Sequence, residues 1–194
     1  MEREALLSGS VQPGGREPAG GRLRLVQDFV NTVDREHGPD LLDEAAALGE
    51  WLARRGLLEP GARVTEADRW AALDLREGVR ALLHANNGAP DDEEARRAVE
   101  DAAARAGLQA TFATEGPALI PARAGVPGAL GHVVAAVFAA MLDGSWPRLK
   151  ACPRDVCGWA FYDRSTNGSA TWCSMRVCGG RVKAGAYYRR RRRL

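Results

Sequence analysis

The chain has 194 residues, of which 45% are hydrophobic, so it can form one domain, or one domain and a small module, with a sizeable core. Its longest apolar run, residues 129–142, is shorter than the ~20 residues that cross a bilayer, which argues against a membrane protein. The net charge of +2 is unevenly distributed along the chain. Residues 147–194 carry twelve Lys or Arg and two Asp or Glu, whereas the first 146 residues carry fifteen Lys or Arg and twenty-three Asp or Glu. A basic end beside an acidic body predicts contact with a polyanion, although a solvated tail that aids solubility has the same composition.

Residues 1–21 are rich in Gly, Pro and charge and have no hydrophobic period, which predicts a disordered leader. They contain no apolar segment of the kind that signal peptides have. The sequence therefore predicts a cytoplasmic protein.

Helical periodicity predicts a helical domain over residues 22–146. Its first helix, over residues 24–35, carries Asp28, Asn31 and Asp34 three positions apart and therefore near one another on one side. These side chains could line a ligand pocket, or they could form a polar face with local capping bonds.

Four further helices and a hairpin follow in this domain. The helices are predicted over residues 43–55, 65–86, 91–107 and 127–143, and a β-hairpin over residues 108–122. Thr65 and Asp68 resemble a capping box, and the run of Val, Phe, Met and Leu after Pro127 marks the core helix. The predicted fold class is mainly α (α+β): a helical N-terminal domain with a small β-hairpin, followed by a C-terminal four-cysteine module.

All the cysteines of the chain form two pairs with the same C-x4-C spacing: Cys152, Cys157, Cys173 and Cys178. Two knuckles this close together suit one structural Zn²⁺ held by four thiolates. Two disulfides are the alternative, but they need an oxidising compartment, for which the N-terminus offers no signal. Four protein ligands leave zinc no open position for water, and the sequence contains no P-loop or G-x-S-x-G motif, so we expect no enzyme.

A helix leaving the second knuckle, from Ser174 towards Tyr188, would carry cations into a basic tail predicted for residues 189–194. The candidates for DNA contact are Arg176, Arg181, Lys183, Arg189, Arg190 and Arg191. Such residues favour binding because each neutralised phosphate releases counterions. The alternative is a charged surface helix that ends in a loose tail.

Four segments of the C-terminal module, with Lys183 beyond them, resemble the CGNR zinc finger: Cys157-Gly-Trp-Ala-Phe-Tyr-Asp163, Ser165-Thr-Asn167, Trp172-Cys-Ser-Met175 and Cys178-Gly-Gly-Arg181. In that family the finger follows an ABATE domain, which is described as a "putative stress-induced transcription regulator". Asp28-Phe-Val-Asn-Thr-Val-Asp34, Trp51-Leu52 and Gly56-Leu57-Leu58 resemble segments of that domain. The resemblance implies an ABATE-like domain over residues 22–146 and a zinc finger over residues 147–188.

The chain departs from the family pattern at two places. Gly180 stands where the family has Asn, and the linker over residues 165–171 is poorer in arginine than is usual. Fewer cations in the linker weaken any phosphate contact that it makes.

The resemblance and the charge polarity together imply a zinc-binding, DNA-binding transcription regulator. Its N-terminal domain would sense a small-molecule ligand or form a homodimer, a role that rests on the resemblance. The alternative is a zinc-stabilised protein-interaction module without specific DNA binding, which the two departures favour. The two-part organisation also predicts that replacing Cys173 by Ser unfolds the C-terminal module and leaves the helical domain melting almost unchanged.

Overall fold

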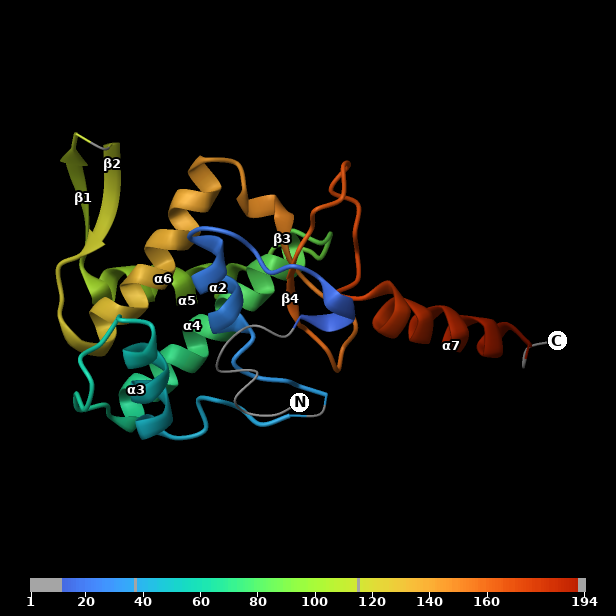
Figure 1. Cartoon of the computed structure of the whole chain (residues 1–194), viewed down its shortest axis with the longest axis horizontal. Helices are drawn as coiled ribbons and strands as arrows, with labels where there is room; N and C mark the ends of the chain where they lie inside the picture. Colours follow the sequence, from blue (N-terminus) through green and yellow to red (C-terminus); the bar gives the residue numbers. More distant parts are fainter. Residues whose placement is uncertain (1–11, 37, 115, 192–194) are drawn as a thin grey trace.

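The computed structural model describes residues 12–36, 38–114 and 116–191, with the side chains of residues 186–190 left out (Figure 1). Its helices are η1 (Pro13–Gly15), α2 (Leu23–Val30), α3 (Ala45–Arg54), α4 (Glu66–Ala85), α5 (Glu93–Ala106), α6 (Gly125–Leu142), η2 (Trp146–Arg148), η3 (Met175–Gly179) and α7 (Gly180–Arg191). Two antiparallel pairs of strands accompany them, β1 (Leu108–Ala113) with β2 (Gly116–Pro121), and β3 (Leu149–Ala151) with β4 (Ala160–Tyr162). The predicted fold class, mainly α with a small hairpin and a four-cysteine module, is confirmed.

Local sequence signals set several of these elements. The Asp68 amide donates to Thr65 Oγ1 at 3.2 Å, and the Thr65 amide donates to Asp68 Oδ2 at 2.9 Å, which completes the predicted capping box of α4. Gly107 ends α5 in the left-handed region, at φ 60°, where a side chain would be strained. The chain then enters β1 without an intervening loop.

Helix α6 packs against α2, α5 and β2, and its residues Val133, Val137 and Ala140 are buried in the core. Within the described residues it is also the helix long and apolar enough to cross a bilayer, with 56% of its apolar window buried inside the protein. That degree of burial is typical of the core helix of a globular fold.

The core continues without interruption from the helices into the zinc module. Leu149, Trp159 and Phe161 of the module belong to the same cluster of buried residues as Phe29 and Leu83 of the helical part. The two parts therefore share one core, which was not expected from the sequence.

Helix α2 ends at Val30, earlier than the predicted end at Arg35. The side chain of Asn31 bonds to the backbone of Ala160, and Val33 forms an isolated β-bridge with Asp40. These contacts lead the chain away from the helix axis, so periodicity alone placed the boundary too late.

Residues 12–21, the second half of the predicted disordered leader, pack against the zinc module, whereas residues 1–11 lie outside the described structure. Gln12 is 7% exposed and accepts hydrogen bonds from Gln27 Nε2 at 2.9 Å and Trp159 Nε1 at 3.2 Å. The Arg16 Nε donates to the Cys173 carbonyl at 2.6 Å. The prediction of disorder is thus wrong for this half, because its polar residues find partners that lie far along the chain.

Candidate metal centre and nucleic-acid interface

The first cysteine knuckle is the loop of the β3–β4 hairpin. The Cys152 amide donates to the Trp159 carbonyl at 3.0 Å, and the Cys157 amide donates to the Arg154 carbonyl at 2.8 Å, which closes a tight turn. Gly158 follows at φ 57°, and a Cβ there would lie 3.1 Å from Arg35 Nη1, so glycine suits this position. The two strands β3 and β4 thus flank the first knuckle on either side.

The second knuckle spans the start of η3. The Val177 amide donates to Ser174 Oγ at 3.3 Å, and the Cys178 amide donates to the Ser174 carbonyl at 2.9 Å. Cys173 thus precedes the helical turn and Cys178 lies within it. Both sulfurs face the first knuckle.

The four sulfur atoms are placed as zinc requires. All lie within 4.8 Å of one another, with Cys157 Sγ 3.7 Å from Cys173 Sγ and Cys173 Sγ 3.6 Å from Cys178 Sγ. A tetrahedron of Zn–S bonds of about 2.3 Å has sulfur atoms about 3.8 Å apart. These contacts are far longer than an S–S bond, and all four cysteines are free thiols, so the disulfide alternative does not hold.

Once Cys152 is ionised, the thiols of Cys157 and Cys173 are too close to it to ionise without a cation. The neighbouring Cys152 sulfur raises the pKa of Cys157 to about 12 and, together with Cys157, raises the pKa of Cys173 above its ordinary value. The same contacts lower the pKa of Cys152, because the other thiols donate to its thiolate. A divalent cation bound to all four sulfurs removes this repulsion, and the predicted structural Zn²⁺ is confirmed by the donor set and its geometry.

Glu36 ties this centre to the loop that follows α2. Its carboxylate accepts hydrogen bonds from Arg154 Nη1 at 2.5 Å and Nη2 at 2.7 Å and is ion-paired with Arg181. Arg154 Nη1 also lies 3.8 Å from Cys178 Sγ, close enough to donate to the ligand. Neither Glu36 nor Arg154 was singled out from the sequence, and the position of Arg154 inside the first knuckle was the one available signal.

We expect Glu36→Gln to weaken zinc retention by about ten-fold or more, because partners of metal ligands contribute that much to affinity. The measurement is the rate at which a chelating dye takes zinc from the folded protein. The matched control is Glu50→Gln, since Glu50 pairs with Arg54 on the exposed surface of α3. Equal rates for wild type and Glu36→Gln would show that the Arg154 contact does not support the centre.

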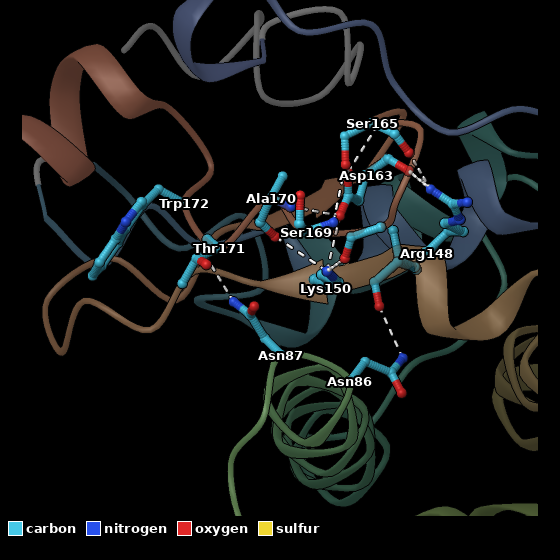
Figure 2. Close-up of polar contacts among 12 residues, drawn as sticks. Asn86, Asn87, Arg148, Lys150, Asp163, Ser165, Ser169, Ala170, Thr171 and Trp172 are labelled. Atoms are coloured by element: carbon cyan, nitrogen blue, oxygen red, sulfur yellow. Dashed lines mark hydrogen bonds and ion pairs between the residues drawn. The ribbon is translucent and has the colours of Figure 1, made fainter.

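A buried ion pair shapes the linker between the knuckles (Figure 2). Lys150 Nζ donates to Asp163 Oδ2 at 2.8 Å and to the Ala170 carbonyl at 3.2 Å, and both charged side chains are almost fully enclosed. Burial opposes ionisation of Asp163, but hydrogen bonds from Lys150, Ser165 and the Ala170 amide lower its pKa to about 2. Lys150 and Asp163 therefore fix the position of the linker through hydrogen bonds to its backbone.

The end of α4 holds the zinc module on the helical domain. Asn86 Nδ2 donates to the Trp146 and Leu149 carbonyls, both at 2.9 Å, and Asn87 Nδ2 donates to the Thr171 carbonyl at 2.8 Å (Figure 2). Arg80, only 2% exposed, donates to the Gly158 carbonyl at 2.6 Å. Side chains of α4 and of the two residues that follow it thus contact β3, the first knuckle and the linker.

The predicted DNA-contact residues differ in their surroundings. Arg176 on η3 and Lys183 on α7 are exposed, and neither pairs with an acidic residue in the described ranges. Arg181 is 51% exposed at its side chain but is held by Glu36. Arg191 is exposed and, with Arg189 and Arg190, lies within α7, although the side chains of the latter two are outside the description. The predicted basic tail over residues 189–194 is therefore helical up to Arg191, and the rest of it lies outside the described residues.

Asp28, Asn31 and Asp34 bond within the fold. Asp28 accepts from Arg24 Nε at 2.8 Å, and Asp34 Oδ1 accepts from the Glu36 amide at 3.1 Å. Asn31 is 5% exposed, and its side chain donates to the Ala160 carbonyl at 2.9 Å and accepts from the Ala160 amide at 2.8 Å. These bonds favour the polar face over the ligand pocket, and they give Asn31 a role in joining the two halves.

Comparison with protein families agrees with this architecture. The ABATE family model, described as "Putative stress-induced transcription regulator", matches residues 23–145, and the model of the CGNR zinc finger matches residues 148–191. No curated protein matches the chain. Since the first match covers more than half of the chain, the protein belongs to the ABATE family and carries a CGNR zinc finger after that domain.

Proposed function

We propose that the protein is a DNA-binding transcription regulator whose zinc centre fixes a basic helix for contact with the duplex. The observation that supports this most strongly is α7, which leaves the body of the protein (Figure 1). It begins two residues after the zinc ligand Cys178, so the metal anchors the end of the helix nearest the fold. An α-helix of this kind fits the major groove of B-DNA.

The charges around this helix suit a polyanion. Arg176 and Lys183 are exposed near its start, and the sequence adds five consecutive arginines from residue 189 to residue 193. The body carries the opposite net charge, −8 over the first 146 residues, which would turn the helix towards DNA and the body away from it. Phosphate contacts supply the affinity in this proposal, and base contacts from Arg176 would supply specificity.

The test is fluorescence anisotropy of the zinc-loaded protein on duplex DNA across a salt series. We expect Lys183→Ala to weaken binding on every sequence and to reduce the slope of log affinity against log salt by about one. The matched control is Arg105→Ala, which removes an exposed cation from α5, on the body of the protein. Identical salt slopes for wild type and both variants would overturn the role of α7.

The second candidate function is a protein-interaction module. The linker over residues 165–171 contains no cation, and its carbonyls at Ser165 and Thr166 already accept from Arg148. Binding to a protein partner would be far less sensitive to salt than binding through phosphates. Absence of duplex binding by the zinc-loaded protein at low salt would favour this function.

The proposal includes no reaction, because four thiolates leave zinc without an open position for substrate or water. A reducing compartment such as the cytoplasm would keep these thiols available to the metal. The helical domain would then sense a ligand or pair two copies of the chain.

A further inference from the structure

The β1–β2 hairpin extends beyond the body of the protein (Figure 1) and carries an unusual surface. Its strands contain no charged residue, although edge strands usually carry charges that prevent pairing with another chain. Phe112 is 87% exposed and Ile120 is 46% exposed. Strand β2 packs against α6, but Phe112 remains open to solvent on one face of the ladder and Ile120 on the other.

An apolar groove of about 320 Å³ lies at the root of the same hairpin, between α5 and α6. Leu108 and Leu119 line it from the hairpin, and Phe138 and Met141 line it from α6. Phe138 and Met141 are 44% and 46% exposed, which leaves this side of the core helix uncovered. An apolar cavity of about 150 Å³ holds a benzene ring, so the groove has room for a phenyl side chain.

The exposed phenylalanine and the groove are on the same face of the hairpin. Side chains alternate along a strand, so Phe112 shares a face with the groove residue Leu108. Across the ladder, Phe112 is paired with Pro117, which shares its face with the groove residue Leu119. One continuous apolar face thus runs from the tip of the hairpin into the groove.

We propose that this face is a homodimer interface, in which Phe112 of each copy enters the groove of the other. A two-fold axis through the middle of the hairpins, near the Ala110–Leu119 pair, would place each tip over the other root. Each copy supplies both a projecting Phe112 and a groove. A second copy therefore covers the phenylalanine of the first copy and fills its groove at the same time. The small side chain of Ala110 allows close approach at the axis.

The charges at the groove also suit a second copy. The groove is flanked on α5 by Arg96, which is ion-paired with Asp91, and by Glu100, one turn further on and of opposite sign. Around a two-fold axis, a surface with both signs can face itself with each cation opposite a carboxylate. This inference does not depend on DNA binding.

Sedimentation velocity on the full-length, zinc-loaded protein tests the proposal. We expect wild type to sediment as a dimer of the 20.8 kDa chain and Phe112→Asp to sediment as a monomer. Each lost anchor weakens association about thirty-fold, and a dimer loses two, so the dissociation constant should rise about a thousand-fold. Phe112 is almost fully exposed in the single chain, so Phe112→Asp should not disturb its fold. The variant should bind zinc as the wild type does and melt at the temperature of the wild-type monomer.

The matched control is Trp70→Glu, which changes a 57% exposed aromatic residue that does not line the groove and should leave the dimer intact. A mixture of Phe112→Asp with Phe138→Glu makes the test sharper. The mixed dimer retains one intact Phe112–groove contact, so the mixture should associate more tightly than either variant alone. The proposal would be overturned if the wild type sedimented as a monomer, or if Phe112→Asp left the dimer unchanged. A molecule other than a second copy would then have to bind the groove.

Discussion

Cys173→Ser is expected to lower the melting temperature of the whole chain and to leave no separate transition for the helical domain. Cys173 is 1% exposed and lies in the same buried cluster as the helices, so unfolding of the knuckle exposes the common core. A structural zinc site contributes about 10–16 kcal/mol, which is comparable to the whole stability of a domain. This outcome differs from the independent melting that the sequence suggested. Calorimetry of wild type and variant provides the measurement.

The control for this experiment is Asn167→Ala, an exposed change in the linker between the two knuckles that should leave the melt unchanged. Chelation of zinc from wild type should reproduce the effect of Cys173→Ser. Two transitions, with the one from the helices at its wild-type temperature, would show that the zinc module and the helical domain are separate folding units.

Lys150→Met is expected to destabilise the protein by about 3–5 kcal/mol, because it leaves the carboxylate of Asp163 buried without its cation. The double variant Lys150→Met with Asp163→Leu should recover part of this loss, since it removes the uncompensated charge as well. Chemical denaturation of the zinc-loaded protein measures both values.

The matched control for the buried pair is Arg164→Ala, which breaks an exposed ion pair with Glu17 and should cost less than about 1 kcal/mol. If Lys150→Met lowered the free energy of unfolding no more than Arg164→Ala does, the charge of Lys150 would not be needed to hold the linker. A double variant less stable than the single one would show that Asp163 stabilises the linker chiefly through Ser165 and the Ala170 amide.

The zinc centre was predictable because its signal is local. Two C-x4-C pairs contain all four ligands, and tetrahedral geometry brings their sulfurs together wherever the two loops meet. The capping box at Thr65 was predictable for the same reason, since both bonds join residues three apart. Such features need no knowledge of the rest of the fold.

The residues that join the two halves could not be predicted in this way. Asn31 reaches Ala160, Arg80 reaches Gly158 and Glu36 reaches Arg154, across 78 to 129 positions of sequence. Nothing near Asn31 distinguishes a side chain that bonds to a distant strand from one that binds a ligand. The leader over residues 12–21 was misjudged for the same reason, because Gln12 and Arg16 bond to residues of the zinc module that lie far along the chain.

The structure shows the surroundings of Gly180, which departs from the family pattern. Gly180 lies in helical geometry, at φ −62°, and a Cβ there would meet its nearest neighbour, the Met175 carbonyl oxygen, at 3.5 Å. The backbone therefore does not require glycine at this position, and a Cβ atom is accommodated. The missing side chain removes one polar group from the start of α7, whereas the exposed cations of Arg176 and Lys183 remain.

The most direct test of the proposed function is anisotropy of the zinc-loaded protein on the DNA upstream of its own coding sequence, against a scrambled duplex, across a salt series. We predict tighter binding to the upstream fragment, with a preference that persists as salt weakens both complexes. Equal and equally salt-labile binding to the two duplexes would contradict specific recognition. It would reduce α7 and its arginines to a nonspecific anchor and favour the protein-interaction module.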